Sequence, residues 1–173
     1  MTLVHSDPAT RKQIGVGDRA PEFALPSHTG ELVRLSDLIG RKNVVLYFYP
    51  KDDTPGCTAQ ARSFRDSYEA FVEAGAEVVG ISSDSVECHK QFASKYELPF
   101  VLLSDEHGEV RRLYGVPKTL GLLPGRVTYV IDRRGIVRHV FSSQLDAIGH
   151  ISAALKALDA LEEDRPGPPG VVA

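Results

Sequence analysis

The chain has 173 residues, of which 42% are hydrophobic and 25% are charged, as expected for one globular domain of ordinary size. Its formal net charge of -3 provides no positive field for nucleic acid or an anionic membrane. Two cysteines, Cys57 and Cys88, are too few for a disulfide framework, and no pair among the six histidines has a recognisable metal-ligand spacing.

Both ends of the chain are expected to lie outside the domain. Residues 1–13 show no periodicity and predict a flexible arm, while residues 162–173 are rich in Pro and Gly and predict a disordered tail. The first residues lack the apolar region of a secretory signal, and no apolar run approaches the length of a membrane span. We therefore expect a single domain over residues 14–161 in a cytoplasmic protein.

Strands and helices alternate along this domain. Residues 43–49 and 77–82 are short apolar runs, typical of strands that are buried on both faces. Apolar side chains recur at helical spacing over residues 58–74 and 85–96, and Ser85 is suited to cap the second of these helices.

The second half of the domain is predicted to contain a strand, a short helix, a hairpin and a closing helix, at residues 100–103, 109–114, 126–131 with 136–141, and 145–161. A leading segment at residues 21–38 precedes the main sheet. This order predicts the α/β class, with a mixed central sheet flanked by helices. The order of elements is that of a thioredoxin-like fold with an N-terminal extension.

The most informative stretch surrounds Cys57, between the strand at residues 43–49 and the following helix. In α/β sheets, binding and catalytic sites form at the carboxyl ends of the strands. Free backbone N–H groups and the positive end of the dipole lie at a helix start, and they stabilise a thiolate. Pro50, Pro55 and Gly56 give the intervening loop a rigid shape. This setting favours a reactive Cys57.

Two other interpretations of Cys57 compete with this one. A free cysteine can be a small buried hydrophobe, which is the better interpretation for a cysteine without such a context. Disulfide exchange of the thioredoxin kind requires Cys-x-x-Cys, but the second position of that motif is occupied by Gln60. The context therefore favours a reactive Cys57 without a local dithiol partner.

At this point the sequence resembles a known family. Pro50, Thr54 and Cys57 match the peroxiredoxin signature Pro-x-x-x-Thr-x-x-Cys. The segment FYPKDDTPGCTAQA is similar to the peroxiredoxin Q, or bacterioferritin comigratory protein, branch of that family. The resemblance extends over residues 14–160, through segments such as GAEVVGISSDS and LPGRVTYVIDRRG.

The resemblance implies that the chain is a thiol peroxidase of hydrogen peroxide and organic hydroperoxides. Cys57 would be the nucleophile that becomes a sulfenic acid, Thr54 would hydrogen-bond the peroxide oxygens, and Pro50 would shield the thiolate. Arg126 matches the arginine that holds the thiolate and the charge on the leaving oxygen. Without the family match, Arg126 would be interpreted as a surface arginine of the hairpin. Gln60 is expected to be an outer polar residue of the site, and no metal, haem or flavin cofactor is implied.

The resemblance leaves the resolving cysteine open. Many members of the branch carry one where this chain has Arg62, and others carry one near Ala93. Cys88 is therefore a shifted match. It is either the resolving partner in an intramolecular disulfide or a buried packing residue on a face shared with Phe92.

In the second case the enzyme is a one-cysteine type that relies on an external thiol. The branch also implies recycling by thioredoxin or a similar dithiol, and a monomeric enzyme. A different class of function, a redox-dependent holdase or signalling protein using the same sulfenate, is the alternative.

Overall fold

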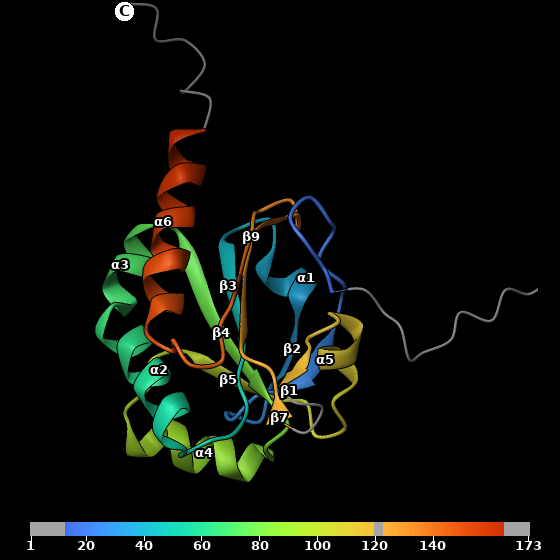
Figure 1. The fold of residues 1–173 in the computed structure, drawn as a ribbon, viewed down its shortest axis with the longest axis vertical. Coiled ribbons are helices and arrows are strands. Elements are labelled where there is room, and N and C mark those ends of the chain that lie inside the picture. Colours follow the sequence, from blue (N-terminus) through green and yellow to red (C-terminus); the bar gives the residue numbers. More distant parts are fainter. Residues whose placement is uncertain (1–12, 120–122, 165–173) are drawn as a thin grey trace, which may run out of the picture.

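The computed structural model describes residues 13–119 and 123–164 of the chain. A five-stranded sheet of order β5-β4-β3-β8-β9 forms its centre (Figure 1). The first three of these strands run parallel to one another, while β8 is antiparallel to both β3 and β9, so the sheet is mixed as predicted. The strands are β3 (Asn43–Phe48), β4 (Ala76–Ser82), β5 (Val101–Ser104), β8 (Val127–Ile131) and β9 (Val137–Ser142).

Helices cover both faces of the sheet, which explains why the central strands are nearly continuous apolar runs (Figure 1). One face carries α2 (Pro55–Asp66), α3 (Tyr68–Glu73), α4 (Val86–Lys95) and α6 (Gly149–Glu163). The other face carries α1 (Leu35–Leu38) and α5 (Glu109–Leu113). The chain moves from β3 to β4 and then to β5 toward the same edge of the sheet. Because crossovers between parallel strands are right-handed, α2 and α4 therefore lie on the same face of the sheet.

Short strand pairs complete the fold. The predicted N-terminal extension contains the antiparallel pair β1 (Ala24–Pro26) and β2 (Leu32–Arg34), and Ser27 forms a bridge to Leu103 at the β5 edge. A second antiparallel pair, β6 (Lys118–Thr119) and β7 (Leu123–Pro124), precedes β8. The thioredoxin-like prediction with an N-terminal extension is confirmed.

Two predicted helices differ from the observed ones. The helix expected at residues 58–74 begins earlier, at Pro55, and is interrupted at Ser67 (φ -100°, ψ 5°) between α2 and α3. Proline is favoured at a first helical position because it has no N–H to satisfy there. The helix expected at residues 145–161 begins only at Gly149, whose N–H donates to the Asp146 carboxylate at 2.9 Å in the preceding turn.

The predicted arm and tail lie mostly outside the described residues, whereas the predicted domain limits at residues 14 and 161 lie within them. The arm over residues 1–13 has only its last residue within them. At the other end α6 continues through Glu163, so the first residues of the predicted tail are helical. Among the described helices, none has the length and apolar character needed to cross a membrane.

Candidate active site

Cys57 lies in the first turn of α2, where the loop after β3 turns into the helix. Thr54 is the cap residue, and the Thr54 carbonyl accepts the first helical hydrogen bond from Thr58 at 2.8 Å. The N–H of Cys57, the third residue of α2, is among the N–H groups at this helix start that have no partner in a preceding turn. The thiol is 2% exposed and belongs to the core between α2 and the sheet. The predicted position at a helix start is therefore observed.

Arg126 immediately precedes β8, the neighbour of β3 in the sheet, and its side chain reaches Cys57. The guanidinium is buried at 5% exposure, and its Nη2 donates to the Cys57 Sγ at 3.4 Å. Nη1 donates to the Gln60 Oε1 at 2.6 Å, and Nε donates to the Gln144 carbonyl at 3.3 Å. The interpretation of Arg126 as a surface residue is thus wrong, because the β3–β8 pairing carries it beneath the α2 N-terminus.

Gly56 allows this close approach. A Cβ atom at that position would lie 3.1 Å from Nη2 of Arg126, which is tighter than an ordinary van der Waals contact. Any larger residue would therefore displace the guanidinium that faces Cys57. The glycine of the motif is explained by this contact, because its backbone has no positive φ.

Thr54 and Pro50 both lie in the loop between β3 and α2 and are partly buried. The Thr54 hydroxyl donates to the Lys51 carbonyl at 2.8 Å. The hydroxyl proton of Thr54 is therefore already used in a hydrogen bond. The lone pairs of its oxygen can accept a hydrogen bond from a peroxide O–H.

Cys88 lies in the first turn of α4, where its N–H donates to the capping Ser85 hydroxyl at 3.2 Å. The cysteine is exposed, whereas Phe92 on the same helix is 2% exposed. Cys88 is therefore not the buried packing residue that one interpretation expected. Both cysteines are free thiols, and α2 and α4 share one face of the sheet.

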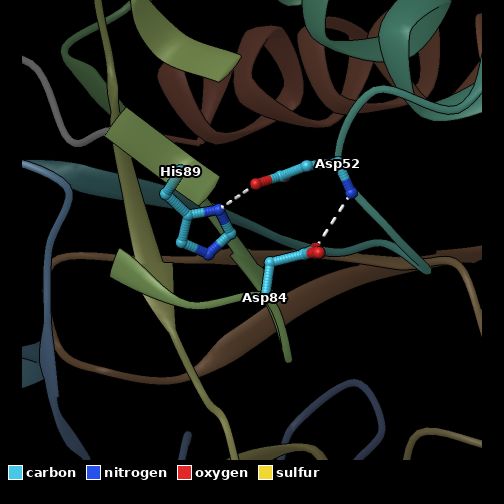
Figure 2. Close-up of side chains that lie close together, drawn as sticks. All are labelled: Asp52, Asp84 and His89. Carbon is cyan, nitrogen blue, oxygen red and sulfur yellow. Dashed lines mark hydrogen bonds and ion pairs between the residues drawn. The ribbon is translucent and has the colours of Figure 1, made fainter. Parts of the chain in front are cut away.

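Three further side chains, which the sequence did not single out, gather beside this loop. Asp52, Asp84 and His89 bring ligand-type atoms within 4.8 Å of one another (Figure 2). Both nitrogens of the His89 ring already have protein partners, Nδ1 on the Asp52 carboxylate at 2.6 Å and Nε2 on the Leu103 carbonyl at 2.9 Å. The geometry is thus that of a hydrogen-bonded network, with no imidazole lone pair directed at a metal.

A second buried arginine, Arg111 of α5, supports the loop from the other face of the sheet. Its Nη2 donates to the Tyr49 carbonyl at 2.8 Å, and its backbone N–H donates to Asp105 at 3.0 Å. Burial lowers the pKa of Arg111 from its ordinary value, while the negative charges of Asp105, Cys57 and Asp84 act in the opposite direction. The start of the loop is therefore anchored by a cation that also acts electrostatically on Cys57.

Comparisons with known proteins agree with this geometry. A family model described as the AhpC/TSA family matches residues 16–140. "Peroxiredoxin Q, chloroplastic" of Sedum lineare is 56% identical over 147 residues, which cover 84% of this chain and 78% of that protein. The protein of the same name in Arabidopsis thaliana is 53% identical over 149 residues, which cover 86% of this chain and 68% of that protein.

Solved structures match over most of their length. The crystal structure of peroxidoxin BcpB from Mycobacterium tuberculosis has a TM-score of 0.79 at 42% identity and covers 84% of this chain and 97% of that one. The bacterioferritin comigratory protein of Xanthomonas campestris, described for its alkyl peroxide reduction activity, has a TM-score of 0.74 at 33% identity. That match covers 80% of this chain and 91% of the other.

The comparisons correct one expectation. The cytoplasmic location expected from the N-terminal residues is wrong, since the most similar relatives named above are chloroplastic proteins. The absence of a secretory signal does not distinguish the cytoplasm from other compartments.

Proposed function

The chain belongs to the AhpC/TSA family and to its peroxiredoxin Q branch, and on this premise we propose that Cys57 is the residue with which this thiol peroxidase reduces hydroperoxides. One observation carries the assignment. The buried Arg126 guanidinium donates to the Cys57 sulfur at the start of α2. A permanent cation and a helix N-terminus at one sulfur are the surroundings in which a thiolate is stabilised.

The chemistry follows from these contacts. The Cys57 sulfur attacks one oxygen of the peroxide, and the O–O bond breaks. The attacked oxygen stays on sulfur as a sulfenic acid, and the other leaves with the electron pair and becomes water or an alcohol after it takes a proton. Arg126 stabilises the charge on the leaving oxygen, and the Thr54 hydroxyl accepts a hydrogen bond from the bound peroxide. Pro50 covers the loop side of the thiolate.

We assign Cys88 as the resolving cysteine. Its thiol attacks the sulfenic sulfur of Cys57, which forms the disulfide and releases water, and a dithiol such as thioredoxin then reduces the disulfide. Three observations support this role: Cys88 is exposed, it lies in the first turn of α4, and α4 lies on the same face as α2. Because Cys57 is buried and Cys88 is exposed, we expect local unfolding at the helix starts to bring the two sulfurs together.

The substrates are expected to be hydrogen peroxide and organic hydroperoxides. The Xanthomonas campestris relative is described for alkyl peroxide reduction, which supports organic hydroperoxides as substrates. The monomeric state stays a prediction, which gel filtration with light scattering tests.

Mass spectrometry after one equivalent of peroxide tests the assignment. The wild type should become lighter by two hydrogen atoms and show a peptide that links Cys57 to Cys88. Cys88→Ser should carry a sulfenic acid on Cys57, and Cys57→Ser should be unchanged. A lone Cys57 sulfenate in the wild type would instead establish a one-cysteine enzyme. Peroxide consumption by Cys57→Ser at the wild-type rate would contradict the catalytic assignment.

A further inference from the structure

A buried network joins the loop between β3 and α2 to α4. The Asp52 carboxylate faces the His89 ring nitrogen Nδ1 at 2.6 Å (Figure 2). It also accepts a hydrogen bond from the Tyr49 hydroxyl at 2.6 Å. The Asp52 N–H donates to the Asp84 carboxylate at 2.9 Å. His89 is fully buried and Asp52 is 8% exposed. The loop is thereby fixed to α4 at a residue adjacent to Cys88.

The acceptors that face the His89 ring determine where the protons of this network lie. The His89 Nε2 faces the Leu103 carbonyl at 2.9 Å, so Nε2 carries a proton and donates it. The short contact between Nδ1 and the Asp52 carboxylate then holds a second proton, and the two side chains together are neutral. Separating them would leave an unpaired polar or charged group in a buried place, which is costly.

A second, exposed contact links the same loop to the end of α4. The Asp53 carboxylate accepts hydrogen bonds from the Lys95 ammonium at 2.9 and 3.1 Å and from the Tyr96 hydroxyl at 2.9 Å. Exposed ion pairs contribute little to stability. The buried Asp52–His89 pair is therefore the stronger attachment of the loop to α4.

We propose that Asp52 and His89 form a positioning pair that keeps the loop closed during peroxide attack and must open before oxidised Cys57 meets Cys88. Cys88 directly precedes His89 in α4, so unwinding the first turns of α4 to deliver Cys88 draws His89 away from Asp52. This inference rests on the proposed function of Cys57 and Cys88, and it adds a determinant of the rate between them.

The pair then sets the fate of the sulfenic acid. While the loop is closed, a second hydroperoxide can transfer an oxygen to the Cys57 sulfur, which becomes a sulfinic acid as the O–O bond breaks and water or an alcohol leaves. While the loop is open, Cys88 forms the disulfide. A tighter pair thus favours the sulfinic acid at high peroxide, and a weaker pair favours the disulfide.

The test compares His89→Ala and Asp52→Ala with the wild type in rapid-mixing experiments. We expect disulfide formation to accelerate about tenfold in each, within the range of coupling between contacting residues. The sulfinic fraction at high peroxide should fall. The double variant should match either single variant, because the two residues act as one unit. His89→Gln, which keeps an N–H donor, should remain closest to the wild type and provides a folded variant if His89→Ala does not fold.

Phe71→Leu is the control for a purely structural effect. Phe71 is a fully buried ring in α3 and belongs neither to the loop nor to α4. Its truncation should lower the unfolding temperature while the ratio of disulfide to sulfinic acid stays at the wild-type value. The same ratio in His89→Ala as in Phe71→Leu would overturn the proposal.

A parallel measurement removes the dependence on Cys88. In a Cys88→Ser background, the sulfenic acid of Cys57 is trapped with dimedone, and the trapping rate reports how often the loop opens. His89→Ala should raise this rate about tenfold over the Cys88→Ser protein alone. If the wild type forms no internal disulfide, the resolving role of Cys88 fails, yet faster trapping would still support the pair. An unchanged trapping rate would refute the pair.

Discussion

Arg126→Ala should slow the reaction of Cys57 with peroxide by about 10²- to 10³-fold, since one donor to a developing charge contributes roughly 2.7–4 kcal/mol. The Arg126 guanidinium donates one hydrogen bond to the Cys57 sulfur and two to protein oxygens. Only the bond to the sulfur is expected to change in strength during the reaction with peroxide. The two oxygens, on Gln60 and Gln144, lose their donor, and an unsatisfied buried acceptor costs about 1–3 kcal/mol. For the two acceptors together this is about 2–6 kcal/mol, below most of the roughly 5–15 kcal/mol range of ordinary domain stability, so the variant should be destabilised but remain folded.

Stopped-flow mixing with excess peroxide measures this first step directly, before any resolution. Arg126→Lys keeps the charge but lacks the forked donors, so it should fall between the wild type and Arg126→Ala. Arg62→Ala is the matched control, because Arg62 is an exposed arginine of α2 on the same helix as Cys57. A rate for Arg126→Ala equal to that of Arg62→Ala would show that the contact with the Cys57 sulfur does not contribute to catalysis.

Three further predictions follow from the same geometry. Gly56→Ala should slow peroxide reduction by displacing Arg126 while thermal unfolding shifts little, and loss of both together would mean that the loop itself had collapsed. Burial lowers the pKa of His28 and of His150 below the ordinary 6.5, so the unfolded chain binds more protons and stability should decline as pH falls through about 6.5. Thermal unfolding between about pH 8 and pH 5 tests this, and a flat profile would contradict it. Cys57→Ser should unfold at nearly the wild-type temperature yet lose all peroxide consumption, and residual turnover would point to another nucleophile.

The sheet and the position of Cys57 were predictable because they depend on local patterns. Continuous apolar runs identify strands covered on both faces, and β3 and β4 fit this pattern. The strand–loop–helix context alone predicts Cys57 at the start of a helix. The exposure of Cys88 was not predictable in the same way, since its helical spacing with Phe92 suggested a shared buried face. Early positions in a helix can instead extend past the edge of the core.

The contacts that complete the site were not predictable from local pattern. Arg126 meets Cys57 only because β8 pairs with β3, and sequence spacing contains no signal for that pairing. His89 was considered only for metal-ligand spacing to another histidine, whereas its actual partner is Asp52, 37 positions earlier in the chain. Two features of the sequence could have indicated this contact: His89 is adjacent to Cys88, and Asp52 is one of two aspartates in the loop before Cys57.

The loop between β3 and α2 must be closed for the attack on peroxide and open for disulfide formation. Attack on peroxide requires a closed, ordered site, and Arg126 and Arg111 supply it by reaching in from beside β8 and from α5. Resolution requires the same loop to open, and the attachment that lies beside Cys88 is the Asp52–His89 pair. Because the arginines do not lie on the helix that carries Cys88, α4 can release the loop while the groups that hold the Cys57 sulfur remain anchored to the sheet and to α5. The Asp52–His89 pair thus helps to close the loop and is the contact that must break when the loop opens, whereas Arg126 and Arg111 support the site from elements that do not carry Cys88.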